Sequence, residues 1–165
     1  MRQLSAALGS AAFFVAAPGT VVGLGPWFVT RWRLPDPDTY PVALMVLGGV
    51  LIVVGLIPPV AAFARFARAG GTPMPAAPTT HLVVAGFNRY VRNPMYAGLL
   101  VVIVGQALLF ARWELILYAG FFWAVTAAFV RWYEEPTLAQ QYGAEYEAYR
   151  LAVPAWIPRV PPRRG

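Results

Sequence analysis

Two clusters of polar residues, each at the edge of a long apolar run, hold the side chains that could do chemistry in this chain. The first cluster centres on Arg92-Asn93-Pro94, where Asn93 is expected to cap a helix and Pro94 to occupy its first turn. Such a helix start presents backbone N–H groups and a positive dipole end to an anion, with Arg92 beside it. The cluster suits an anionic ligand, although a plain helix start with a cytoplasmic arginine has the same sequence pattern.

The second cluster, Arg131-Trp132-Tyr133-Glu134-Glu135, follows another apolar run. Carboxylates at a helix C-terminus oppose the helix dipole, and an adjacent pair close to lipid costs more free energy. Arg131 can compensate Glu135 at i, i+4, in the less favourable orientation of such a pair. The alternative is that Glu134 or Glu135 binds a cationic or hydroxyl-bearing ligand.

The elements that must position these clusters are predicted to be transmembrane helices. The chain is 59% hydrophobic and 12% charged, which is too apolar for an ordinary soluble domain. Because about 20 apolar residues cross a bilayer, its four long apolar runs without charge predict an all-α integral membrane protein of about four transmembrane helices. The third and fourth form a helical hairpin, and a short C-terminal interfacial helix follows. The expected spans are Leu4 to Val29, Val42 to Ala64, Met95 to Ala111 and Trp113 to Val130.

We expect a single membrane domain, with two spans in residues 1–68, a cytoplasmic linker in 69–81 and the polar clusters in 82–158. Prolines and glycines within the first two spans are expected to kink both helices. A signal peptide ending near Ala17 is an alternative for the first span, but apolar residues continue beyond Pro18. We expect the chain to form one membrane-embedded unit with no separate soluble domain.

The positions of the charges point to a membrane rather than a nucleic acid. The formal charge is +6, and the 13 basic residues are all arginine. Arginines follow the second and fourth predicted spans, so both termini and both clusters are expected in the cytoplasm, with a bacterial inner membrane as the location. The expected partner is the lipid bilayer, with no nucleic acid. A chain without cysteine and with one histidine also leads us to expect no metal.

The order and spacing of the motifs resembles the isoprenylcysteine carboxyl methyltransferase family of membrane-embedded enzymes. Phospholipid N-methyltransferases are similar over the same stretch. The likeness covers roughly His81 to Pro158. Three motifs carry it, namely residues 82–98 (LVVAGFNRYVRNPMYAG), 134–138 (EEPTL) and 142–149 (YGAEYEAY).

The resemblance implies S-adenosyl-L-methionine as the cofactor and an apolar, lipid-like or prenylated small molecule as the methyl acceptor. It points to Arg92, Tyr96 and Glu135 as catalytic residues. Asn93 stands where the family usually has histidine; it can hydrogen-bond the cofactor or cap the helix but cannot titrate. The expected cofactor-binding residues are His81, Val83, Gly86, Tyr90, Arg92, Asn93, Pro94, Tyr96, Gly98, Glu134 and Glu135.

Several functions remain open at this point. A carboxylate acceptor is already ionised at pH 7 and needs no base, whereas a phospholipid amine would have to lose a proton. A sterol-reductase-like enzyme using NADPH and a non-enzymatic membrane scaffold are further alternatives. Aromatic faces for a sulfonium are available on Tyr90, Tyr96, Trp132 and Tyr133. The acceptor, the oligomeric state and the separate roles of Glu134 and Glu135 are left open.

Overall fold

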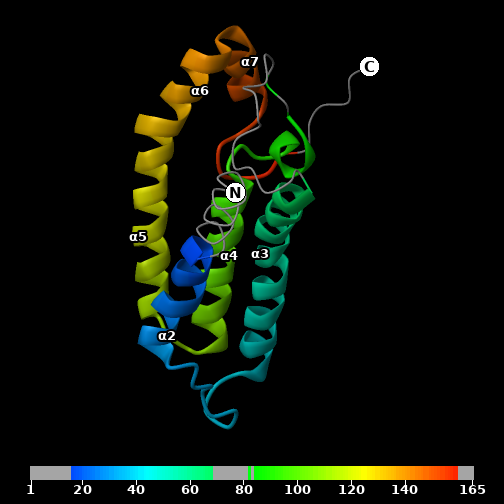
Figure 1. Cartoon of the computed structure of the whole chain (residues 1–165). Helices are drawn as coiled ribbons and strands as arrows, with labels where there is room; N and C mark the ends of the chain where they lie inside the picture. Colours follow the sequence, from blue (N-terminus) through cyan, green and yellow to red (C-terminus); the bar gives the residue numbers. More distant parts are fainter. Residues whose placement is uncertain (1–15, 69–81, 83, 160–165) are drawn as a thin grey trace, which may run out of the picture.

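Every regular element that the structure describes is a helix. The computed structural model describes residues 16–68, 82 and 84–159, so His81, Val83 and the expected linker at 69–81 lie outside the described residues. Three long helices run side by side, with a shorter helix against them and two helices at one end (Figure 1). In chain order the elements are η1 (Thr20–Leu24), α2 (Gly25–Thr30), α3 (Val42–Arg68), η2 (Gly86–Arg89), α4 (Pro94–Leu109), α5 (Glu114–Phe129), η3 (Val130–Glu134), α6 (Glu135–Tyr142) and α7 (Ala144–Ala152).

Within the described ranges, two helices are long and apolar enough to cross a bilayer. They are Val42–Ala64 and Glu114–Tyr142, with mean hydropathies of 2.5 and 1.5. Within each apolar window 17% of the residues are buried inside the protein, which fits helices that face lipid better than helices of a soluble core. α4 is apolar but has 16 residues, below the usual length of a span. The predicted all-helical fold is confirmed for the described residues, while four spans and a membrane-crossing hairpin stay predictions.

Prolines widen two helices rather than breaking them. The π-helix η1 ends two residues before Pro26, and the π-helix η3 ends two residues before Pro136. A proline has no N–H for the carbonyl four residues earlier, and its ring clashes with that carbonyl. A π turn relieves the clash without ending the helix. The kink predicted in the first span is therefore a π turn, and the second π turn sets the direction of the acidic pair.

Polar side chains satisfy the carbonyls that Pro26 leaves open. The Gln106 amide donates to the Val22 carbonyl at 2.7 Å, and the Tyr118 hydroxyl donates to the Val21 carbonyl at 2.9 Å. Gln106 is buried, 6% exposed, next to an apolar core. Ile103, Ala107, Leu115 and Ala119 form that core. These two hydrogen bonds fix the first described helix against α4 and α5.

Replacing Gln106 with leucine should lower the free energy of unfolding by about 1–3 kcal/mol, because the buried Val22 carbonyl loses its donor. Thermal unfolding in detergent measures the change. Gln106→Glu is the matched control: it keeps the length of the side chain but puts no amide donor on the carbonyl, so it should destabilise at least as much. An unchanged melting temperature in Gln106→Leu would show that the hydrogen bond contributes nothing.

Glycines allow α3 and α4 to touch through their backbones. A Cβ added at Gly55 would lie 2.7 Å from the Gly98 carbonyl oxygen, and one added at Gly48 would lie 2.6 Å from that of Gly105. In the other direction, a Cβ added at Gly98 would lie 2.5 Å from the Gly55 carbonyl oxygen, and one added at Gly105 would lie 2.7 Å from that of Gly48. Small residues permit this approach between helices in lipid, where packing is the main attraction. The contact fixes where α4 begins, and so where Arg92 and Asn93 lie.

Candidate cofactor site

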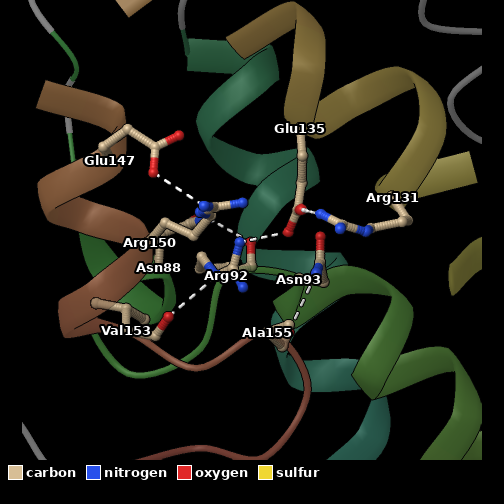
Figure 2. Close-up of polar contacts among 9 residues, drawn as sticks. All are labelled: Asn88, Arg92, Asn93, Arg131, Glu135, Glu147, Arg150, Val153 and Ala155. Carbon is tan, nitrogen blue, oxygen red and sulfur yellow. Dashed lines mark hydrogen bonds and ion pairs between the residues drawn. The ribbon is translucent and has the colours of Figure 1, made fainter. Parts of the chain in front are cut away.

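Arg92 joins the start of α4 to the acidic end of α5 and to the C-terminal segment. Its Nη1 donates to Glu135 Oε1 at 2.5 Å, and its Nε donates to the Val153 carbonyl at 3.0 Å (Figure 2). The side chains of Arg92 and Glu135 are 14% and 11% exposed. Arg131 approaches Glu135 at 3.6 Å but is 69% exposed. The predicted Arg131 pair exists, yet the buried partner of Glu135 is Arg92, which lies 43 residues away in sequence.

The C-terminal segment covers the start of α4. Arg92 N–H donates to the Pro154 carbonyl at 2.8 Å, and Asn93 N–H donates to the Ala155 carbonyl at 3.2 Å. Asn93 stands at the N-cap position, but its side chain makes no cap hydrogen bond; its amide donates to the Ala155 carbonyl at 3.1 Å instead. The predicted side-chain cap is therefore wrong: the side-chain oxygen of Asn93 accepts no N–H from the first turn, and the Nδ2 group of the same side chain donates to the tail. The N–H groups of Arg92 and Asn93, which precede the first helical residue Pro94, are thus bonded to the tail.

The two polar clusters meet at one small cavity. Its volume is about 120 Å³. Glu134 lines it, and Glu134 Oε2 is buried with no hydrogen-bond partner among the described residues. A buried carboxylate oxygen without a donor is costly, so this oxygen is suited to an ammonium or hydroxyl of a ligand. The lining residues are Leu82, Val84, Asn88, Arg92, Asn93, Val130, Glu134, Glu135, Leu138, Tyr146 and Tyr149.

The aromatic rings of this cavity come from α7. Tyr146 is 3% exposed, and the Tyr149 hydroxyl donates to the Asn88 carbonyl at 2.8 Å. Burial raises the pKa of both hydroxyls above the usual value of a tyrosine, and the Arg92 guanidinium counteracts part of the rise at each. Both phenols are therefore neutral donors at pH 7. The sequence showed the Tyr142, Tyr146 and Tyr149 stripe but assigned it to a membrane interface.

The aromatic residues proposed from sequence for a sulfonium are placed less favourably. Trp132 is 79% exposed and Tyr133 is 64% exposed, because the π turn of η3 directs them outwards while Val130 and Glu134 point inwards. Tyr90 is 43% exposed and lines a different groove. Tyr96 is close enough to Glu134 for the two groups to interact electrostatically. Of the four aromatic candidates, Tyr96 is the one beside the acidic pair.

The remaining candidates lie apart from the cavity. Gly86 is exposed and has a left-handed φ of 59° at the start of η2, a conformation that glycine adopts readily. Pro94 and Gly98 line the groove between α3 and α4. Gly98 is also at the helix contact, where any side chain would meet Gly55. Arg92, Asn93, Glu134 and Glu135 are thus brought together, whereas Gly86, Tyr90, Pro94 and Gly98 are not.

The fold and the site together define a class of protein. The described chain is a bundle of apolar helices with two candidate membrane spans and a buried acid–arginine cluster at one end. A family model described as phospholipid methyltransferase matches residues 43–145. The match covers more than half of the chain and includes the Arg92 and Glu135 segments, so the chain belongs to the phospholipid methyltransferase family. No solved structure matches it.

A curated relative carries the second likeness. The chain is 33% identical over 86 residues to protein-S-isoprenylcysteine O-methyltransferase of Schizosaccharomyces pombe. The alignment covers 48% of this chain and 34% of the relative, so the chain spans about a third of that protein's length. The family resemblance predicted from sequence is confirmed. Both matches are to methyltransferases, which favours that reading over the reductase and scaffold readings.

Proposed function

We propose that the protein is a membrane-embedded methyltransferase that uses S-adenosyl-L-methionine and methylates an apolar, lipid-like acceptor. The observation that supports this most strongly is the meeting of Arg92, Asn93 and the acidic pair at one cavity, with the buried Glu134 oxygen lacking a donor. The family supplies the reaction type. The acceptor that the curated relative suggests is the carboxylate of an isoprenylcysteine.

The residues present fit the polar parts of this cofactor. Glu134 offers an acceptor for its ammonium or ribose hydroxyls, and Arg92 and the neutral Tyr146 hydroxyl offer donors for its carboxylate. A cavity of about 120 Å³ is small beside the roughly 300–1,000 Å³ of usual ligand pockets, so a nucleoside must also enter adjoining space. That space lies across the Arg92–Glu135 pair, where a cavity of about 510 Å³ shares Arg92, Val130 and Glu135.

The chemistry needs positioning more than acid–base groups. Bound S-adenosyl-L-methionine would supply a methyl group to which an acceptor carboxylate oxygen forms a C–O bond while the C–S bond breaks and its electron pair stays on sulfur. Glu134 and Glu135 would favour the cationic cofactor electrostatically and hold it in line. Tyr146 and the apolar Val130 and Leu138 would exclude water from the same end. No proton has to move if the acceptor is a carboxylate.

Replacing the Glu134 carboxylate with an amide should weaken ligand binding without lowering the stability of the protein. We expect Glu134→Gln to weaken S-adenosylhomocysteine binding about tenfold, which corresponds to a lost hydrogen bond to a charged group. Isothermal titration in detergent gives the affinity. The melting temperature should not fall, because the substitution removes a buried carboxylate without a donor. Glu147→Gln is a matched control, since that carboxylate pairs with Arg150 at 3.0 Å and does not line the cavity. Equal affinities of wild type and Glu134→Gln would contradict the assignment.

An amine acceptor is the second candidate, because the matching family is described as phospholipid methyltransferase. The two acceptors differ in product. Protein in vesicles with labelled methyl donor can be given an N-acetyl-S-farnesylcysteine or a phosphatidylethanolamine. Base-labile label on the first indicates a carboxyl ester, whereas base-stable label on the lipid headgroup indicates N-methylation.

A further inference from the structure

A long apolar groove lies between α3 and α4, beneath the C-terminal segment. Its volume is about 610 Å³. Its floor includes Gly55 and Gly98, where the helices touch, and its upper wall includes Tyr90, Trp156 and Pro158. Arg159 is the charged residue that lines it within the described ranges. An apolar groove with a cation in its lining suits one lipid-like chain that carries an anionic head.

Trp156 separates this groove from the polar side of the molecule. The same residue lines the cavity of about 510 Å³ that contains Arg92 and Glu135. No other residue lines both hollows among the described residues. Trp156 is therefore the residue at which the groove and the 510 Å³ cavity adjoin.

The position of Trp156 is held from both sides. Its ring meets Trp123 of α5 edge to face, with centroids 6.3 Å apart and planes at 67°. On one side of it in the chain, the Ala155 carbonyl accepts hydrogen bonds from the Asn93 backbone and side chain. On the other side, Arg159 N–H donates to the Tyr90 carbonyl at 2.9 Å. A bulky ring held in this way is a fixed partition rather than a free membrane anchor.

We propose that Trp156 is the residue that determines which acceptors reach the methyl donor, by limiting the size of the head group that passes from the apolar groove to the Arg92–Glu135 cavity. The inference rests on the proposed function, since it takes the acceptor to be an apolar chain with a carboxylate head. The chain stays in the groove, and the head passes the indole. A membrane anchor at the same position would affect stability but not the choice of head group.

The test compares two acceptors that differ in head size and share chain and charge, N-acetyl- and N-naphthoyl-S-farnesylcysteine. Wild-type protein should methylate the acetyl compound preferentially. Trp156→Ala should raise the naphthoyl-to-acetyl ratio of kcat/KM about tenfold, a typical effect of reshaping an apolar pocket, and Trp156→Phe should give an intermediate ratio. Ile157→Ala is the matched control, because Ile157 is the adjacent residue, is 78% exposed and lines neither hollow.

Two further measurements keep the outcome clear. Competition of both compounds against a fluorescent farnesyl probe gives the same ratio from binding alone, so the inference is judged even without turnover. S-adenosylhomocysteine affinity, measured in each variant, separates an effect on cofactor binding in the cavity that Trp156 also lines from an effect on the head-size ratio. Equal head-size ratios in wild type, Trp156→Phe and Trp156→Ala overturn the inference. Absence of S-adenosylhomocysteine binding in the wild type overturns the proposed function instead, and if Trp156→Ala fails to fold, Trp156→Phe and Trp156→Leu decide.

Discussion

Arg92→Met is expected to lose S-adenosylhomocysteine binding and to unfold far more easily than the wild type. The guanidinium is the buried partner of Glu135 and also holds the Val153 carbonyl. Without it, two adjacent carboxylates remain near lipid with the exposed Arg131 as the neighbouring cation. Removing one member of a buried ion pair typically costs about 3–5 kcal/mol. Thermal unfolding in detergent and titration with S-adenosylhomocysteine measure the two effects.

A double variant separates the structural role of Arg92 from its binding role. Arg92→Met combined with Glu135→Met removes both charges and keeps similar volume, so much of the stability should return. Ligand binding should not return, because the site no longer contains the Arg92 guanidinium or the Glu135 carboxylate. Arg131→Met is the control with a small expected effect on stability, since its side chain is largely exposed. Full binding in the stable double variant would place the ligand elsewhere.

The second large effect is expected at the glycine contact of α3 and α4. A Cβ at Gly98 would lie 2.5 Å from the Gly55 carbonyl oxygen and 2.9 Å from Pro59 Cδ. A Cβ at Gly48 would lie 2.6 Å from both the Gly105 carbonyl oxygen and Leu109 N. Backbone atoms cannot turn aside, so the helices must separate. Gly48→Ala and Gly98→Ala should each destabilise at or above the usual overpacking range of about 1–3 kcal/mol.

Gly49 offers a control in the adjacent position. A Cβ there meets nothing within 4 Å. Gly49→Ala should therefore leave stability unchanged or raise it by about 0.5–1 kcal/mol, because alanine favours a helix more than glycine does. A fall in stability for Gly48→Ala together with no change or a rise for Gly49→Ala would be diagnostic of the contact between α3 and α4. Equal melting temperatures for the two alanine variants would contradict the close approach of α3 and α4.

The sequence predicted the helices for a physical reason, whereas the meeting of the two clusters was implied by the family resemblance; from charge alone the acidic pair was paired with Arg131. Charges are excluded from apolar runs that cross or line a bilayer, so the gap between Asp38 and Arg65 predicted a helix that the structure places at Val42–Arg68. An anionic pair near lipid demands a cation. The expectation that Arg92 and the acidic pair share one hollow is met by the geometry.

Other features had no signal in residue type. The carbonyls of Val153, Pro154 and Ala155 bind Arg92 and Asn93, and a carbonyl group is common to every residue. The direction in which each side chain after residue 130 points depends on the π turn before Pro136. A π turn holds about one residue more than an α turn, so it rotates the following side chains around the helix axis. Trp132 and Tyr133, two of the four rings suggested from sequence, are exposed, whereas Tyr146 and Tyr149 line the cavity.

The glycines of α3 and α4 were visible in sequence but not paired. Gly48 and Gly55 have the same spacing as Gly98 and Gly105, and small residues at such a spacing favour close helices in membranes. Which glycine meets which depends on the antiparallel register, which is set by the whole interface. The family resemblance pointed to Gly98 as a cofactor-binding residue, whereas the structure shows it in the helix contact.

The most direct test of the central claim is the site at which labelled S-adenosyl-L-methionine cross-links to the wild-type protein under ultraviolet light. Peptide mapping by mass spectrometry should place the label within residues 84–96 or 127–156, the segments that line the acid–arginine cavity and the adjoining 510 Å³ cavity, and excess S-adenosylhomocysteine should prevent it. Label confined to residues 42–64, or labelling that S-adenosylhomocysteine does not reduce, would contradict the account.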